Sequence, residues 1–111
     1  MQQDDVVLVL TNAPDLPLAK RIAHLLVGEG LAACVSLGAP ILSVYALKGE
    51  VKETEEIPMT IKTTRGRGAE LIARLTALHP YEVPEAIVVP VAGGHGPYLD
   101  WVRSLTSTPA R

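Results

Sequence analysis

The 111-residue sequence predicts a single α+β domain whose elements follow the order β-α-β-β-α-β, with one more helix near the C-terminus. Three observations predict this class. Continuous apolar runs alternate with stretches whose apolar residues recur every three or four positions, and Gly and Pro separate the two kinds of segment. Hydrophobic residues make up 48% of the chain against 20% charged, which excludes a disordered chain. The length leaves room for one domain, spanning residues 1–111.

The first part of the chain predicts a strand followed by a helix. Val6–Leu10 is a continuous apolar run, typical of a strand that is buried on both faces. Asp15 is a candidate N-cap for the helix, and Gly30 is well placed to end it in a left-handed conformation. The apolar face of this helix consists of Leu18, Ile22, Leu25 and Leu26.

The middle of the chain predicts a β-hairpin. Leu31–Leu47 is strand-like, and Gly38 and Pro40 interrupt it, which indicates a bulge or a bend. Lys48–Glu50 supplies a turn, so the next strand is expected to fold back on the first. Pro58 lacks an N–H group and must therefore face an edge or a bulge. The apolar residues of this returning strand alternate with polar ones and are Ile57, Met59 and Ile61.

The last third predicts a helix, a strand and a short final helix. Arg65–Gly68 leads into the second helix, and His79 ends it because the residue before a proline is pushed out of helical geometry. Ile87–Val89 is read as a third buried run, and a glycine-rich loop follows it. The final helix is indicated by the spacing of Tyr98, Val102 and Leu105. Two helical crossovers between strands of one sheet give a split β-α-β, or ferredoxin-like, sandwich.

Composition excludes several classes of function. Ten Lys and Arg residues face twelve Asp and Glu residues, so the net charge of −2 argues against a nucleic-acid binder that depends on a basic field. The single cysteine excludes an intrachain disulfide, and no apolar run approaches the roughly 20 residues of a membrane helix. The acidic start, Met1–Asp5, lacks the basic segment of a signal peptide, so a soluble, cytoplasmic protein is expected. The high apolar fraction of so short a chain indicates further buried surface between subunits.

One segment gathers groups that suit ligand binding: His79-Pro80-Tyr81-Glu82-Val83-Pro84-Glu85. Two prolines stiffen a stretch that holds an imidazole, a phenol and two carboxylates, and a rigid loop with convergent donors suits a metal or a small ligand. A proline-pinned connector explains the same prolines equally well. The other histidines, His24 and His95, are interpreted as an ordinary helix imidazole and a loop residue near a helix start.

The remaining polar groups have ordinary structural interpretations. Cys34 lies among apolar residues and is read as a small buried hydrophobe rather than a nucleophile. Thr63–Gly68 precedes a helix, but it lacks the lysine-serine ending of a phosphate-binding loop and is read as a solvated turn. Glu53, Glu55 and Glu56 are read as a solvated charge run on the hairpin. No Ser-His-Asp arrangement can be specified from spacing, so no hydrolytic centre is predicted.

With these segments in order, the chain resembles the CutA family of divalent-cation tolerance proteins. The resemblance covers nearly the whole chain, and the segment from His79 to Glu85 is its most specific part. The other matching pieces are Leu31–Val35, Ser43–Tyr45, Lys48–Val51, Ile61–Thr63 and Tyr98–Trp101. The resemblance implies a ferredoxin-like protomer in a tight homotrimer, binding of copper or another divalent metal ion, and a role in metal tolerance without established catalytic activity. It also suggests small-ligand sensing at clefts between subunits.

Carried over residue by residue, the resemblance implies a metal site at His79, with Glu82 and Glu85 as its carboxylate partners. Four further residues would line the same intersubunit cleft: Lys62, Tyr81, Cys34 and Tyr45. In this cleft Lys62 would balance charge and Tyr81 would form hydrogen bonds.

The sequence departs from the family's pattern at several positions. Thr11 stands where some members have a copper-binding cysteine, and Leu78 replaces the first of two adjacent histidines. Copper(I) favours thiolate and imidazole ligands, so the missing thiol should lower the affinity for that ion in particular. Ala46 and Leu47 stand where members often have tryptophans, which implies a more open or differently shaped cleft.

Two other functions are alternatives to metal tolerance. A trimeric signalling or assembly scaffold, which binds a small ligand or a partner protein at the intersubunit clefts, fits a retained loop and a lost thiol. An acylphosphatase-like enzyme on the same fold would need an arginine-bearing phosphate loop after the first strand, and Thr11–Pro14 contains no arginine. The chain is therefore expected not to be an enzyme. Its expected partners are divalent cations and further copies of itself, and no nucleic-acid or membrane partner is expected.

Overall fold

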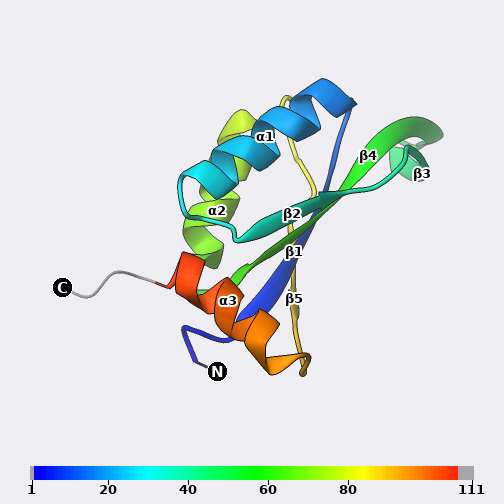
Figure 1. Ribbon diagram of the computed structural model, residues 1–111. Helices are drawn as coiled ribbons and strands as arrows, with labels where there is room; N and C mark the ends of the chain where they lie inside the picture. Colours follow the sequence, from blue (N-terminus) through cyan, green and yellow to red (C-terminus); the bar gives the residue numbers. More distant parts are fainter. Residues whose placement is uncertain (1, 108–111) are drawn as a thin grey trace.

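The computed structural model describes residues 2–107, so Met1 and residues 108–111 of the expected domain lie outside the described residues. Within that range the predicted order of elements and the C-terminal helix are confirmed (Figure 1). None of the described helices is long and apolar enough to cross a membrane. The elements are β1 (Val6–Ala13), α1 (Leu16–Gly28), β2 (Cys34–Leu37), β3 (Ile41–Leu47), β4 (Glu50–Thr64), α2 (Arg65–Leu78), β5 (Ile87–Pro90) and α3 (Gly96–Thr106).

The strands form an antiparallel sheet in the order β2-β4-β1-β5, and β3 pairs with the outer part of β4. At its centre β1 and β4 lie side by side, from Val6 opposite Thr64 to Ala13 opposite Ile57. Helices α1 and α2 lie over one face of this sheet, which is the ferredoxin-like arrangement that the sequence predicts (Figure 1). The fully buried side chains between helices and sheet include Ile22, Leu26, Leu71 and Leu75 from the helices and Val9, Met59 and Ile61 from the strands.

The second face of the sheet has a helix only at one end, where α3 lies. There Val102 packs against Val6, and the Thr64 hydroxyl donates to the Thr106 carbonyl oxygen at 3.1 Å. Beyond α3 the side chains on this face are partly buried or exposed. We call this part the open face; by strand register it carries Leu8, Leu10, Cys34, Ser36, Thr60, Lys62 and Val89.

Two strands predicted to be buried are therefore not enclosed within one chain. Val6–Leu10 is fully covered on the side of α1 and α2, but Leu8 and Leu10 on the open face are only partly buried. Ile87–Val89 lies at the edge of the sheet, where it pairs with β1, and Ile87 is 51% exposed. Both predictions of complete burial are wrong for the isolated chain, because α3 covers only one end of the second face and β5 lies at the edge of the sheet.

The interruption expected at Gly38 and Pro40 is a one-residue bulge. Leu37 pairs with Met59, and Ile41 pairs with Glu56. The three residues between Leu37 and Ile41 therefore lie opposite only two residues of β4. The Gly38 N–H donates to the Pro58 carbonyl oxygen at 3.0 Å. The carbonyl oxygen and the nitrogen of one residue point to the same side of an antiparallel strand. The Pro58 nitrogen, which carries no hydrogen, therefore also faces the bulge, as predicted. A Cβ atom on Gly38 would lie 2.8 Å from Pro58 Cγ, so the bulge requires glycine there.

Beyond the bulge, β3 and residues 50–56 of β4 form a hairpin arm that extends away from the helices (Figure 1). The molecule is accordingly elongated, with extents of 47 × 25 × 24 Å. Lys48 and Gly49 form the turn with φ angles of 52° and 80°, a left-handed pair that suits the twist of a two-residue hairpin. The arm carries exposed large apolar side chains: Ile41, Leu42, Val44, Tyr45, Leu47 and Val51.

Helix α2 begins at Arg65, directly after β4, so the solvated turn predicted over Thr63–Gly68 is wrong. Both threonines of that segment are buried at the end of β4. The first two N–H groups of the helix donate to carbonyl oxygens of the N-terminal segment, at 2.9 Å to Asp5 and 2.7 Å to Gln3. These amides are therefore satisfied by the chain itself rather than by water or an anion.

Candidate functional site

His79 fastens the end of α2 to the end of β1. Its side chain is 7% exposed, and its Nε2 atom lies 2.7 Å from the Asn12 carbonyl oxygen. Its Nδ1 atom accepts the Tyr81 N–H at 3.2 Å. A carbonyl can only accept and an amide can only donate, so the network assigns the proton to Nε2 and the lone pair to Nδ1. The imidazole is therefore neutral and bonded at both nitrogens in this chain.

The rest of the segment from His79 to Glu85, which we call the His79 loop, is tied to the same strand. The Thr11 hydroxyl donates to the Glu85 carbonyl oxygen at 2.6 Å, and the Asn12 side-chain amide donates to Glu85 Oε1 at 3.3 Å. Glu82 is exposed and makes no hydrogen bond or ion pair with another described residue. Both ends of the loop are therefore fixed to β1, and Glu82 extends into solvent between them.

The loop also covers a carboxylate of β4. The Tyr81 hydroxyl donates to Glu56 Oε2 at 2.9 Å, and Glu56 is only 9% exposed. The prediction that Glu56 belongs to a solvated charge run is wrong, although Glu53 and Glu55 are exposed as predicted. The reason is tertiary, because Tyr81 returns from the far end of α2 and lies against this carboxylate.

The pKa of Tyr81 is raised to about 12. The largest cause is burial of the phenol, and the next is its hydrogen bond to Glu56. The neighbouring Tyr45 and Asp15 add smaller effects of the same sign. Tyr81 is therefore a protonated donor at neutral pH. Tyr45 itself is anchored on the arm by a 2.8 Å hydrogen bond to the Thr54 hydroxyl.

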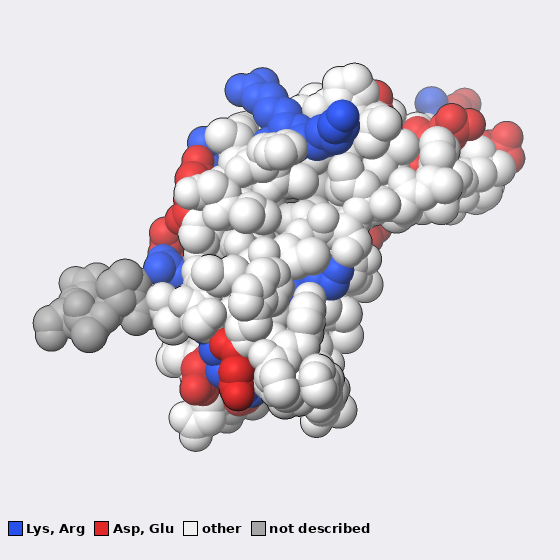
Figure 2. Space-filling view, in the orientation of Figure 1, with Lys and Arg blue, Asp and Glu red and all other residues white. Residues whose placement is uncertain are grey.

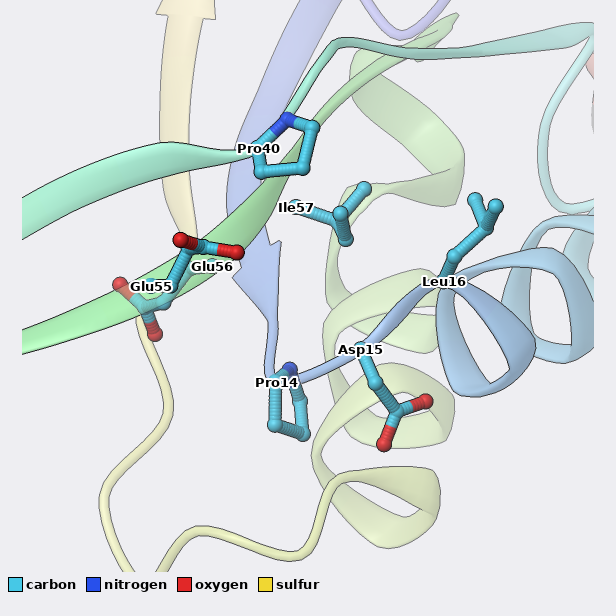
Figure 3. Close-up of a pocket in the computed structure, with 7 residues that line it drawn as sticks. All are labelled: Pro14, Asp15, Leu16, Pro40, Glu55, Glu56 and Ile57. Carbon is cyan, nitrogen blue, oxygen red and sulfur yellow. The ribbon is translucent and has the colours of Figure 1, made fainter.

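A shallow pocket of about 260 Å³ lies beside Glu56, between the start of α1 and the bulge (Figure 3). Figure 3 shows Glu55 and Glu56 on β4, with Asp15 at the entrance to α1. Asp15 is the N-cap that the sequence predicts, since its Oδ1 accepts the Leu18 N–H at 2.9 Å. The pocket is otherwise apolar, and its lining consists of Pro14, Asp15, Leu16, Pro40, Glu55, Glu56 and Ile57.

Lys62 and Cys34 lie elsewhere, opposite each other on the open face. The Lys62 ammonium donates to the Ser36 hydroxyl and lies 3.9 Å from Cys34 Sγ. Cys34 is only partly buried and lies next to an ammonium group, so its interpretation as a small buried hydrophobe is wrong. Tyr98 of α3 adjoins the same thiol, and burial together with the contact to Cys34 raises the pKa of its phenol.

The predicted site residues, together with Glu56, Ser36 and Tyr98, which were not predicted, thus fall into two groups within one chain. Glu56 and Lys62 are six residues apart on β4, which corresponds to about 20 Å along a strand. The first group lies at the bulge and comprises His79, Tyr81, Glu85, Glu56 and Tyr45. The second, which we call the Lys62 group, comprises Lys62, Cys34, Ser36 and Tyr98. A single cleft that joins them between subunits stays a prediction.

Residues 2–107 contain no cluster of three or more His, Cys, Asp or Glu side chains that could hold a metal ion within the chain. His24 is an ordinary helix imidazole, as predicted, and lies exposed on α1. His95 is the N-cap of α3 and makes no side-chain cap hydrogen bond. Of the three histidines, only His79 is buried among the groups of the candidate site.

Residues 7–105 match the family of the CutA1 divalent ion tolerance protein. A relative from Thermus thermophilus, the divalent-cation tolerance protein CutA, is 44% identical over 98 residues, which cover 88% of this chain and 95% of that protein. The human protein CutA is 42% identical over 97 residues, which cover 87% of this chain and 54% of the human protein. The chain thus spans about half the length of that human relative.

The fold agrees with a solved structure of the same kind. The crystal structure of CutA from Xylella fastidiosa superposes with a TM-score of 0.90 at 43% sequence identity. The superposition covers 93% of this chain and 99% of the other.

Proposed function

Because the chain belongs to the CutA1 divalent ion tolerance protein family, which supports a role in metal tolerance, we propose that it is a cytoplasmic, non-catalytic homotrimer that binds copper or another divalent metal ion. His79 is the central ligand in this proposal, and Glu82 and Glu85 supply carboxylate oxygens. The observation that carries it is the orientation of the His79 ring.

Metal-binding histidines commonly donate their second N–H to a carbonyl or carboxylate, which fixes the tautomer and aims the lone pair. His79 has this arrangement, because Nε2–H donates to the Asn12 carbonyl oxygen at 2.7 Å and Nδ1 carries the lone pair. A metal ion at Nδ1 would have to displace the Tyr81 N–H, which now donates to that atom at 3.2 Å. Metal binding is therefore expected to loosen the His79 loop next to Tyr81.

The available ligands favour particular ions. An imidazole with carboxylates suits copper(II) or zinc better than copper(I), which prefers thiolates. By the resemblance, Thr11 stands where some members of the family have a copper-binding cysteine, and its hydroxyl donates to the Glu85 carbonyl oxygen at 2.6 Å. In this proposal Thr11 holds the loop in place, and His79 and the carboxylates are the metal ligands.

Exposed apolar surface supports the homotrimer. The hairpin arm presents large apolar side chains to solvent, and the edge strand β5 exposes Ile87. Pairing with another copy of the chain covers exposed strand edges and apolar patches of this kind. A ring with closed rotational symmetry limits the assembly to a fixed number of subunits. In this arrangement the Glu82 carboxylate, which has no partner among the described residues of its own chain, would face the neighbouring subunit.

One observation favours the alternative of a signalling or assembly scaffold. Both ring nitrogens of His79 are already satisfied by backbone groups, as expected of a histidine whose role is to hold a connector in place. In that case a small ligand or a partner protein would be recognised between subunits and metal binding would be incidental.

Calorimetric titration of copper(II), and then zinc, into chelator-stripped protein separates the two functions. We compare the wild type with His79→Gln, whose amide can still donate to the Asn12 carbonyl, and with His24→Gln on the exposed face of α1 as the matched control. The metal function predicts about one ion per subunit, lost in His79→Gln and retained in His24→Gln.

The oligomeric mass of each variant is measured alongside, so that loss of assembly is not mistaken for loss of a ligand. Absence of binding, or binding that is the same in His79→Gln and the wild type, would exclude the His79 site and leave the scaffold.

A further inference from the structure

Tyr81 contacts His79 through both its backbone and its ring. Its N–H donates to His79 Nδ1 at 3.2 Å, and the two rings meet edge-on with their centroids 4.5 Å apart. Nδ1 is the nitrogen whose lone pair a metal ion would use, because Nε2 already donates to the Asn12 carbonyl oxygen. The metal-binding side of the imidazole is therefore occupied by Tyr81 in this chain.

The position of Tyr81 is fixed in turn by Glu56. The phenol donates to Glu56 Oε2 at 2.9 Å, and this carboxylate is only 9% exposed. A hydrogen bond to a carboxylate is stronger than one between neutral groups. None of the ion pairs among the described residues includes Glu56, so no cation of the described chain competes with the phenol for it. The phenol therefore holds the middle of the His79 loop against β4.

Tyr81 has room to move, whereas His79 does not. The Tyr81 side chain is 36% exposed at the surface, while His79 is 7% exposed. The Tyr81 ring can therefore turn outward without disturbing the core between the helices and the sheet. When it does so, the lone pair of Nδ1 becomes free and water can accept the Tyr81 N–H. The geometry thus allows a closed and an open form of the loop, which differ in the hydrogen bonds of Tyr81 to His79 and Glu56.

The charge at this end of the molecule favours a cation in the open form. Residues 41–56 carry four Glu and two Lys. Figure 2 shows this largely acidic surface at the end of the molecule where the hairpin arm extends. A field of this sign raises the local concentration of cations. Access to Nδ1, rather than charge, is therefore the step that limits metal binding.

We propose that Tyr81 is an autoinhibitory latch of the His79 metal site. While Glu56 holds the phenol, the Tyr81 amide caps Nδ1, and a metal ion binds only to the fraction of molecules in which the latch is open. The apparent dissociation constant equals the intrinsic one divided by that fraction, so the latch lowers the affinity. This inference rests on the proposed metal function and adds its regulation, because a contact that draws Glu56 away from the phenol would open the site.

Hydrogen exchange in the metal-free protein tests the latch by itself. Tyr81→Phe deletes the hydroxyl and keeps the ring beside His79, so we expect the amide of residue 81 to exchange at least about fivefold faster than in the wild type. Glu56→Gln keeps a weaker, neutral acceptor, and its rate should lie between those two. Ser104→Ala is the control, because it removes an exposed hydroxyl hydrogen bond on α3 and should leave the rate at residue 81 unchanged.

Calorimetric titration of zinc chloride into the same variants tests what the latch does. We expect the dissociation constant for zinc to fall at least about fivefold in Tyr81→Phe and to stay unchanged in Ser104→Ala. The direction of the change is decisive. If Tyr81 supported the site or bound the metal itself, loss of its hydroxyl would weaken zinc binding, whereas loss of a latch strengthens it.

The outcomes separate the latch from the metal function. If the wild type and Tyr81→Phe bind zinc equally well, the latch alone is overturned. Tighter zinc binding in Tyr81→Phe without faster exchange in the metal-free protein also overturns it, because the released Glu56 carboxylate would then be acting as a metal ligand. If neither protein binds zinc, the proposed metal function fails, and the latch fails with it.

Discussion

The His79 loop and the hairpin arm differ in how their side chains find partners. In the loop, the polar groups of His79, Tyr81 and Glu85 are bonded within the chain, to β1 and β4. In the arm, large apolar side chains such as Val44 and Val51 are 60% and 79% exposed. Apart from the exposed Glu82, the polar groups of the loop therefore find partners within the chain, whereas the arm has a surface that only another molecule can bury. This difference suggests that the loop sets the chemistry of the site and the arm sets the assembly around it.

The largest expected effect comes from a charge on the arm. Val44→Asp would place a carboxylate in the apolar contact that we propose between copies, where an unpaired charge costs several kcal/mol. We expect the mass in solution to fall from that of a trimer to that of a single chain, with the circular dichroism spectrum unchanged. Sedimentation velocity measures this, and Ala69→Asp on the exposed side of α2 is the control. A trimer that persists in Val44→Asp would show that the arm does not carry the assembly.

Removal of one hydroxyl in each region sharpens the comparison. Thr11→Val deletes the donor to the Glu85 carbonyl at a position that is 2% exposed, so we expect a loss of about 1–3 kcal/mol in the free energy of unfolding. Tyr45→Phe deletes an exposed hydrogen bond to Thr54 on the arm and should change that free energy by only about 0.5 kcal/mol. Urea unfolding at one protein concentration compares the two, and equal losses would refute the contrast.

A further comparison concerns Tyr81 and pH. Its pKa is about 12 in the folded chain against an ordinary 10.0, so the folded state holds the phenolic proton more tightly than the unfolded state. The stability that this proton gives is complete below pH 10 and is lost as the pH rises from 10 toward 12. We expect the stability of wild type to fall more steeply over this interval than that of Tyr81→Phe, which at neutral pH loses about 0.5–1.5 kcal/mol. Parallel pH profiles would mean that the Glu56 contact does not form in solution.

Local patterns in the sequence were sufficient for much of the fold. The cap at Asp15, the left-handed Gly30 and the end of α2 before Pro80 each follow from side-chain chemistry within a few residues. Gly38 and Pro40 indicate the bulge for the same reason. What local patterns could not show was which face of the sheet stays uncovered, so Val6–Leu10 and Ile87–Val89 were expected to be more buried than they are.

The site was harder to predict because its contacts join distant segments. The alternation along β4 correctly places Ile57 on the core side and Glu56 on the other, but nothing near Glu56 indicates that Tyr81 will cover it. The pairing of Lys62 with Cys34 depends on strand register, which the individual strands do not reveal. The heptad from His79 to Glu85 was visible as a candidate, yet the way its imidazole is bonded to β1 emerges only from the folded chain.

Hydrogen exchange at the Tyr81 amide, with and without saturating zinc, tests most directly the claim that the His79 loop is both a fastened connector and a metal site. Without zinc we expect this amide to be protected, because it donates to His79 Nδ1. With zinc bound we expect exchange at least about tenfold faster, since one lone pair cannot serve the metal and the amide together. Protection that stays the same while zinc binds would contradict the claim.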